Sequence, residues 1–186
     1  MEDKQIVGLY WARSEQAISE TAKKYGKYCY YIANNILRNY EDSEECVNDT
    51  YLKAWGAMPP KRPEKLSAFL GKITRNLSIN KYKLLNTKKR GDGQLPIALE
   101  ELKECIPSGD SVEQAMEEKE LVQIFNRFLE SLPEEKRKVF MRRYWYFSPV
   151  REIAEAYGMG ESKVKMILLR TRKEFKIYLE QEGVVL

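Results

Sequence analysis

The chain has 186 residues, of which 43% are hydrophobic and 32% are charged, and its formal net charge is +4. This composition favours a soluble, helix-rich protein and argues against a disordered chain. No run of about 18 apolar residues is present, so we expect no membrane insertion. The first residues lack the apolar segment of a secretory signal, and we therefore expect a cytoplasmic location.

The sequence also argues against an enzyme. It contains no histidine, the commonest general base and metal ligand. Neither a GxGxxG nor a GxxxxGK[ST] loop appears, so we expect no nucleotide site. The cysteines are Cys29, Cys46 and Cys105, and this odd number without CxxC spacing predicts neither a zinc site nor a disulfide framework. We therefore expect no catalytic residue, cofactor, metal or small-molecule substrate.

Helical periodicity runs along the chain, whereas alternating strand patterns are nearly absent, so we expect an all-α fold. In the first domain, residues 1–90, we predict four helices that form one small bundle. Their expected ranges are 3–11, 14–37, about 43–57 and 66–85. The third helix is expected to be capped by Asp42 or Ser43 and to end at the prolines of Met58–Pro63. In the fourth helix, Leu84 is expected to point inward.

Residues 91–111 contain acidic side chains together with glycines and prolines. We predict a flexible acidic linker here, with one helical turn at Ala98–Glu104. The second domain is expected over residues 112–186. The linker therefore separates two small helical domains.

The second domain is predicted to contain helices at 112–131, 133–144, 149–157 and 161–181. The last two are hinged at Gly158-Met159-Gly160, as in a helix-turn-helix. On the last helix, apolar or small residues at spacings of four, three and four are expected to face inward: Val164, Leu168, Thr171 and Phe175. The cations between them are then left on the outer face.

Charge is distributed in blocks along the chain. Residues 61–90 carry ten basic side chains and one acidic side chain, a net charge of +9. Residues 91–120 carry two basic and nine acidic side chains, a net charge of −7. Concentrating like charge costs stability, and a polyanionic partner offsets that cost by counterion release. The pattern favours two nucleic-acid contacts separated by a connector that avoids nucleic acid.

Four stretches, in order along the chain, resemble signatures of one bacterial protein family. They are EECVNDTYLKAW (Glu44–Trp55), FLGKITRNLSINKYKLLNTKKR (Phe69–Arg90), LPEEKRKVFMRRYW (Leu132–Trp145) and REIAEAYGMGESKVKMILLRTR (Arg151–Arg172). Together they resemble the extracytoplasmic-function sigma factors, the smallest promoter-recognition subunits of bacterial RNA polymerase. The resemblance covers nearly the whole chain. It implies a non-enzymatic subunit that binds core RNA polymerase, recognises minus-ten and minus-thirty-five promoter elements and helps to melt the DNA.

In such a protein, the helix at 66–85 and the loop Gly56–Ser67 would hold the unwound minus-ten element. Cations would follow the phosphates of the single strand, while asparagine amides would offer hydrogen bonds to bases. The residues matched to this role are Lys61, Arg62, Lys72, Arg75, Asn76, Asn80, Lys81 and Lys83. For Asn76, the alternative of a buried structural amide stays open.

The resemblance assigns the minus-thirty-five element to the helix-turn-helix, which would read duplex DNA in the major groove. The residues expected there are Ser162, Lys163, Lys165, Met166 and Arg170, with Arg172 and Lys173 nearer the DNA backbone. Met166 and Ile167 replace a usual Ser-Arg pair, so the promoter sequence cannot be taken from relatives.

The helix that begins near Glu44 would dock on the largest polymerase subunit through Glu44, Glu45, Asn48 and Asp49. Alternatively, these acids only complement the helix dipole. Asn48 and Asn80 depart from the family pattern, which has Gln and Asp there. The acidic linker would thread through the polymerase, or serve only as a solvated spacer. Many members are held inactive by an anti-sigma factor, so the resemblance leaves room for such a partner.

Two other functions remain open at this point. The chain could be a stand-alone helix-turn-helix regulator that binds duplex DNA as a dimer, which would not explain the +9 block of the first domain. It could instead be a helical protein-binding module, which would not explain the helix-turn-helix. Binding to core RNA polymerase would separate these functions from that of a sigma factor.

Overall fold

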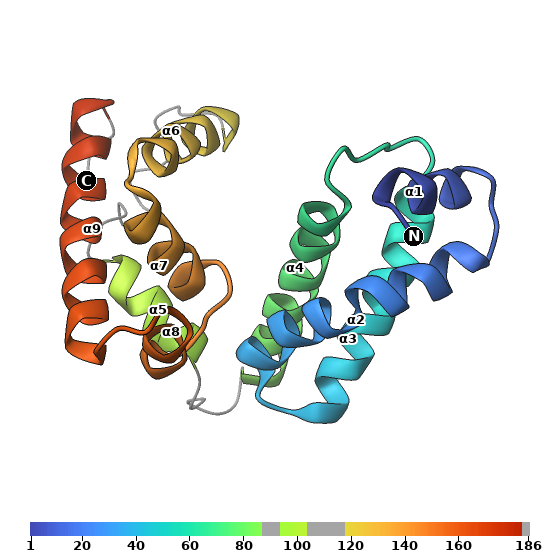
Figure 1. Ribbon diagram of the computed structural model, residues 1–186, viewed down its shortest axis with the longest axis horizontal. Coiled ribbons are helices and arrows are strands. Elements are labelled where there is room, and N and C mark those ends of the chain that lie inside the picture. The colour runs from blue at the N-terminus through green and yellow to red at the C-terminus, as the bar shows by residue number, and fades with distance from the viewer. Residues whose placement is uncertain (87–93, 104–117, 184–186) are drawn as a thin grey trace. The chain divides into compact units, whose positions relative to one another are not determined.

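The computed structural model describes residues 1–86, 94–103 and 118–183 of the chain (Figure 1). All regular secondary structure in these ranges is α-helical, which confirms the all-α fold. The chain divides into two compact units, Met1–Gly93 and Gln94–Leu186. Within the described ranges, no helix has the length and hydropathy needed to cross a membrane.

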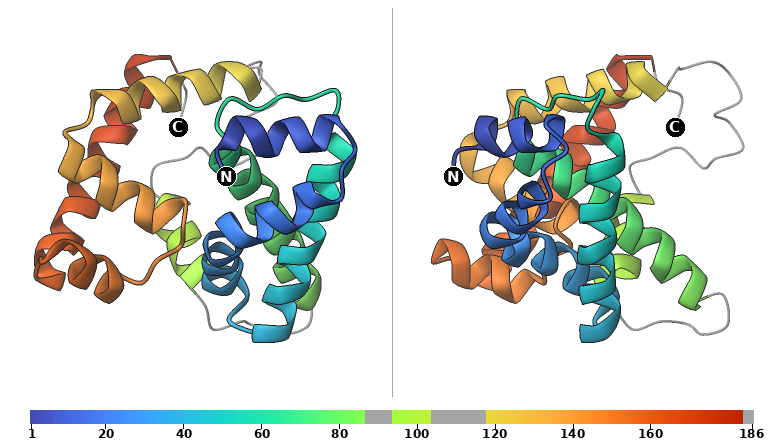
Figure 2. Two further views of the ribbon diagram at one scale, coloured as in Figure 1. Left: turned by 45° about the vertical axis from the view of Figure 1, so that its right-hand side comes forward. Right: turned by 90° about the vertical axis from the view of Figure 1, so that its right-hand side faces the viewer.

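The first unit is a bundle of four helices, α1 (Asp3–Trp11), α2 (Gln16–Leu37), α3 (Tyr40–Ala57) and α4 (Leu66–Asn86). The three long helices pack against one another, and α1 packs on α2 (Figure 2). Their buried apolar side chains recur at helical spacing, so each helix turns one face to a common core. A buried hydrogen bond of 3.0 Å between Thr50 and Thr74 also joins α3 to α4.

Two details of the first unit differ from the sequence expectations. The helix α3 begins at Tyr40, because the side chain of Asn39 caps it by accepting a 2.9 Å hydrogen bond from the backbone N–H of Asp42. Neither Asp42 nor Ser43 is therefore the cap. Leu84 is 75% exposed instead of pointing inward, because the inward face of α4 there continues from Ser78 to the half-buried Lys81.

The second unit contains α5 (Gln94–Lys103), α6 (Glu118–Ser131), α7 (Glu134–Tyr144), α8 (Val150–Tyr157) and α9 (Glu161–Gln181). Aromatic side chains from three helices meet at its centre. The rings of Phe128 on α6 and Phe175 on α9 lie 4.8 Å apart, and Phe140 on α7 contacts both. These contacts hold α7 and α9 together.

The last two helices form the predicted helix-turn-helix. Gly158 has φ of +61°, a left-handed conformation that suits glycine and ends α8. Met159 N–H then donates to the carbonyl oxygen of Ala154 at 2.9 Å. After Gly160, α9 starts in a new direction with Val164 and Leu168 facing the core, as expected.

The helix α5 differs from the expected linker. In place of one helical turn at Ala98–Glu104, residues Gln94–Lys103 form a ten-residue helix that belongs to the second unit. Ala98 is fully buried, and α5 packs on α7. Glu104, the rest of the predicted linker and residues 112–117 lie outside the described ranges.

Candidate nucleic-acid interface

One face of α4 is an exposed polar stripe. The buried residues Leu70, Thr74 and Ser78 recur every four positions and turn one side of the helix to the core. Because the same spacing applies to the opposite side, the exposed residues there also align. They are Lys72, Asn76, Asn80 and Lys83, which we call the α4 stripe. Asn76 is thus exposed, and the alternative of a buried amide is excluded.

Arg75 and Lys81 do not share this exposure. Arg75 is half-buried, and burial lowers the pKa of its guanidinium. Lys81 Nζ lies 2.8 Å from Asp42 Oδ1 and 2.6 Å from Glu45 Oε2 on α3. Burial opposes protonation of Lys81, but these two carboxylates outweigh it and raise the Lys81 pKa. Lys81 is thereby engaged with the acidic cluster of α3.

The loop between α3 and α4 carries the other two predicted contacts of this unit. Lys61 and Arg62 are exposed there, next to the end of α1. The Arg62 guanidinium lies 5.5 Å from the centre of the Trp11 ring. The Trp11 indole N–H donates to the carbonyl oxygen of Lys61 at 3.3 Å. The sequence offered no signal for Trp11, because this contact joins residues 50 positions apart.

The exposed side of α9 gathers most of the residues predicted to bind duplex DNA. With Val164, Leu168, Thr171 and Phe175 turned to the core, the remaining side chains of the helix form one outer surface. The predicted residues exposed on it are Ser162, Lys163, Lys165, Met166, Arg170 and Lys173, which we call the α9 face. Lys176, three positions after Lys173, is exposed as well. The helical period of the sequence could have predicted this exposure of Lys176.

Two lysines of the α9 face also have carboxylate partners. Lys163 Nζ lies 2.7 Å from Glu135 Oε1, and Lys165 Nζ lies 3.9 Å from Glu161 Oε2. All four side chains are at least half exposed, so these pairs contribute little stability and a DNA phosphate can displace them.

Arg172 does not belong to the α9 face. Its side chain is 12% exposed, and its Nη1 donates to the Tyr144 hydroxyl at 2.8 Å. Tyr144 in turn donates to Glu101 Oε2 at 2.9 Å. Arg172 therefore contacts α7 and α5 inside the unit, where the sequence interpretation had placed it near the DNA backbone.

Glu101 is the centre of this internal network. Its carboxylate accepts hydrogen bonds from Arg143 Nε at 3.0 Å and from Arg143 Nη2 at 2.7 Å. Arg143 is 2% exposed, so this bidentate pair lies at the edge of the core. Burial alone would raise the pKa of Glu101, but the bonds from Arg143 and Tyr144 outweigh it and lower this pKa. Glu101 thus ties α5 to the helix-turn-helix.

The α3 residues predicted to dock on the polymerase lie together. Glu44, Glu45 and Asn48 are exposed on one side of α3, and Asp49 beside them is half-buried. Glu45 keeps 66% of its side chain exposed despite its contact with Lys81. A carboxylate-rich surface is therefore available to a basic partner.

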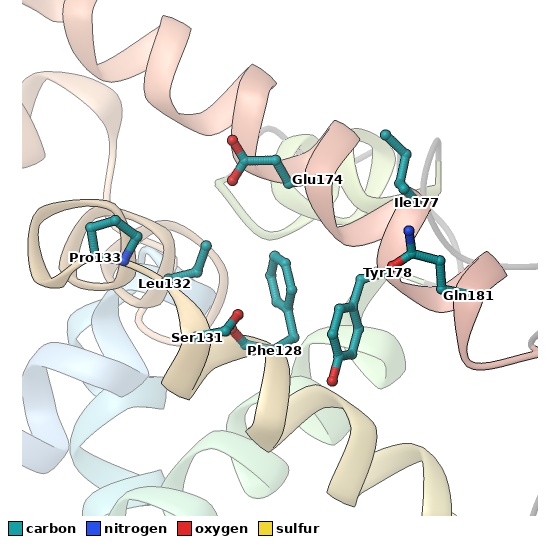
Figure 3. A pocket seen from close by; sticks show the side chains of 8 residues that line it. All are labelled: Phe128, Ser131, Leu132, Pro133, Glu174, Ile177, Tyr178 and Gln181. Atoms are coloured by element: carbon teal, nitrogen blue, oxygen red, sulfur yellow. The ribbon is translucent and has the colours of Figure 1, made fainter.

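A pocket of about 280 Å³ lies between α6 and the C-terminal half of α9 (Figure 3). Phe128, Leu132 and Pro133 line one side, and Ile177 and Tyr178 line the other. None of its lining residues is basic and Glu174 adds a carboxylate, so the pocket offers no cationic side chain to a phosphate. It is distinct from the α9 face.

Comparison with known protein families identifies both units. Residues 21–86 match the family described as Sigma-70 region 2, and residues 123–175 match Sigma-70, region 4. No curated protein matches the chain. The first match contains residues 21–37 of α2 together with α3 and α4, and the second contains α8 and residues 161–175 of α9. Both α1 and α5 lie outside the matched ranges.

Proposed function

The chain belongs to the RNA polymerase sigma factor family and is consistent with its extracytoplasmic-function type, and from this premise we propose that it binds core RNA polymerase and opens promoter DNA. Its region 2 and region 4 domains support a role in promoter recognition. The proposal adds which surface carries out each step. As a subunit without chemistry of its own, the protein would act in the cytoplasm and use the catalytic site of the polymerase.

The α4 stripe is proposed to hold the unwound minus-ten strand. Lys72 and Lys83 bind phosphates, and the amides of Asn76 and Asn80 bind base edges. Lys61 and Arg62 extend this surface from the adjoining loop. Arg75, which is half-buried, contributes less than the exposed cations.

The α9 face is proposed to enter the major groove at the minus-thirty-five element. Its N-terminal residues Ser162, Lys163, Lys165 and Met166 reach base edges, since this part of a recognition helix lies deepest in the groove. Arg170 and Lys173 bind the flanking phosphates. Arg172 supports the helix from inside through Tyr144.

The acidic side of α3 is proposed to bind the polymerase. Glu44, Glu45, Asn48 and Asp49 offer a surface that complements a basic partner, and such complementarity steers association. Lys81 pairs with Glu45 and Asp42 beside this surface, and Glu45 stays largely exposed to the partner.

A single observation carries the proposal: both family-matched regions present the exposed cations predicted for DNA on a helix backed by buried residues of its own unit. A duplex contact alone would need only the α9 face. The exposed amides and lysines of α4 are the feature that a stand-alone helix-turn-helix regulator does not require.

The test is transcription by purified core polymerase from a library of random promoters, with and without the chain. We expect the chain to co-elute with core polymerase and to enrich promoters with two conserved elements. Tight binding of one duplex operator without polymerase, together with no binding to core, would favour the stand-alone regulator instead.

A further inference from the structure

The short helix α1 lies beside the loop that joins α3 to α4, in both Figure 1 and Figure 2. It contacts the loop near both ends. At its C-terminal end, the Trp11 N–H binds the Lys61 carbonyl oxygen. At its N-terminal end, Asp3 accepts a hydrogen bond from the backbone of Leu66, where α4 begins. The helix therefore spans the loop of residues 59–65.

The first of these contacts also involves a DNA-binding candidate. The Arg62 guanidinium lies 5.5 Å from the centre of the Trp11 ring, within the range of a cation–π interaction. Trp11 thus contacts two neighbouring loop residues in different ways, one through its N–H group and one through its ring. Both Lys61 and Arg62 remain exposed to a ligand.

The helix α1 is anchored without the Trp11 side chain. Ile6 and Tyr10 are fully buried, and the Tyr10 hydroxyl lies 2.9 Å from Thr21 Oγ1 on α2. Asp3 Oδ1 also accepts hydrogen bonds of 2.6 Å from Lys24 and Tyr25. Trp11 itself is 41% exposed, so it adds little to the core. Its contacts are directed at the loop.

The neighbouring residue Arg13 secures the other element that leads into the loop. Its Nη1 donates to the carbonyl oxygen of Trp55 at 2.9 Å, and its guanidinium lies 5.3 Å from the Trp55 ring centre. The C-terminal end of α3 is therefore held by the same corner of the chain. The loop between these anchors is the segment that Trp11 contacts directly, beside the 3.1 Å hydrogen bond from Lys61 N–H to the Ala57 carbonyl oxygen.

We propose that Trp11 is a positioning residue that holds the 59–65 loop so that Lys61 and Arg62 face an unpaired DNA strand. The effect of Trp11 on DNA binding rests on the function proposed above for this loop. The Trp11 N–H binds the Lys61 carbonyl oxygen, and the Arg62 guanidinium lies over the indole ring. Without these two contacts, the side chains of Lys61 and Arg62 would become ordered only when DNA binds. The entropy lost in that step would weaken the affinity for DNA.

The test compares the full-length chain with W11A, W11F, R62A and the W11A/R62A double variant. The first readout is hydrogen exchange of the backbone amides of residues 61, 62 and 64–66. In W11A we expect exchange there to be at least about threefold faster, with α2 and α3 unchanged. W11F keeps a ring under Arg62 but lacks the N–H donor, so its exchange is expected to be intermediate. Unchanged loop exchange in both Trp11 variants would overturn the proposal.

The second readout is binding to a pool of random single-stranded 20-nucleotide DNA at low salt. We expect R62A to bind about three- to tenfold more weakly and W11A about two- to fivefold more weakly. The double variant should lose less affinity than the product of the two single losses, because Trp11 is expected to act partly through Arg62 and partly through Lys61. If the two losses multiply in full, Trp11 does not act through Arg62 and the proposal as stated is wrong.

The two readouts separate this inference from the proposed function. If R62A binds single-stranded DNA as tightly as the unaltered chain, the DNA role of the loop is contradicted, while exchange still decides whether Trp11 holds the loop. If R62A weakens binding and neither Trp11 variant changes binding or exchange, only the role of Trp11 is contradicted.

Discussion

At the scale of single residues, solvent exposure distinguishes between side chains that the sequence had predicted to contact DNA alike. Arg170 and Arg172 are two positions apart, and both were expected at the DNA. Arg170 is exposed, whereas Arg172 bonds to Tyr144 inside the unit. Arg172 lies four positions after the buried Leu168 and three before the buried Phe175, so it shares their side of the helix. Arg170 instead follows the exposed Met166 by four positions.

The first prediction concerns Glu101. The E101Q variant keeps the size of the side chain but removes the charge that pairs with Arg143. Breaking a fully buried ion pair costs about 3–5 kcal/mol, and because Glu101 is 25% exposed we expect about 1–3 kcal/mol. Hydrogen exchange of the α7 amides measures this loss in the second unit alone. Unchanged exchange would mean that the network does not stabilise the helix-turn-helix.

The same carboxylate predicts a pH dependence. The pKa of Glu101 is lower in the folded chain than the usual value of about 4.3, because hydrogen bonds from Arg143 and Tyr144 outweigh burial. Its stabilising contribution is therefore complete above the unfolded-state pKa and is lost as pH falls through the folded-state pKa. We expect E101Q to lose less stability than the unaltered chain between about pH 6 and pH 3, as measured by exchange in α7. Equal losses would contradict this assignment.

The α9 lysines and arginines give a third residue-scale prediction. The K165A/R170A variant should bind promoter duplex about 10- to 100-fold more weakly, since it removes a base contact by Lys165, worth about 1–3 kcal/mol, and a phosphate contact by Arg170. Its affinity for core polymerase should be unchanged. The charge-matched control is K4A/K23A, which removes two exposed lysines of the first unit outside the α4 stripe. If both variants lose the same affinity, the effect is net charge and not recognition.

At the scale of elements, the turn before α9 depends on one glycine. Gly158 has φ of +61° and open space around its Cβ position, so alanine would be strained by backbone conformation alone. We expect G158A to lower the free energy of unfolding of the second unit by about 1 kcal/mol. The control is G160S, because Gly160 precedes α9 with φ of −72° and serine is a preferred N-cap there. A G158A variant as stable as G160S would contradict the role assigned to this turn.

The helix α3 supplies a further element-scale prediction. E45K should bind core polymerase at least about tenfold more weakly if the acidic surface docks there. Glu45 also contacts Lys81, so the matched control is K81Q, which breaks the same ion pair but keeps the carboxylate. We expect K81Q to retain core affinity. Equal losses in both variants would show that the ion pair matters and the docking surface does not.

At the scale of the whole molecule, local patterns predicted the bundle of the first unit and the helix-turn-helix, because periodic burial and glycine turns are local signals. They did not predict α5 as a packed helix or Lys81 as part of an acidic cluster. The pairs Glu101–Arg143 and Lys81–Glu45 join residues 42 and 36 positions apart. No local sequence pattern shows which distant residues will pair. The stretch that contains α5 was predicted as a linker because acidic residues among glycines resemble a solvated spacer.

The two cationic faces imply a division of labour between the units. Under the proposed function, the α9 face binds duplex DNA, whereas the α4 stripe and its loop bind a single strand. Since each face has its own supporting core, changes on one should leave the other intact. Promoter binding and promoter melting should therefore be separable by mutation.

The most direct test is permanganate footprinting of unpaired thymines on a promoter selected with core polymerase and this chain. We predict that K72A/N80A, on the α4 stripe, still protects the minus-thirty-five duplex but leaves the minus-ten thymines unreactive. K165A/R170A should lose the duplex protection, and a pre-opened minus-ten bubble should restore its binding. If K72A/N80A melts the promoter as well as the unaltered chain does, the assignment of the single strand to α4 is contradicted.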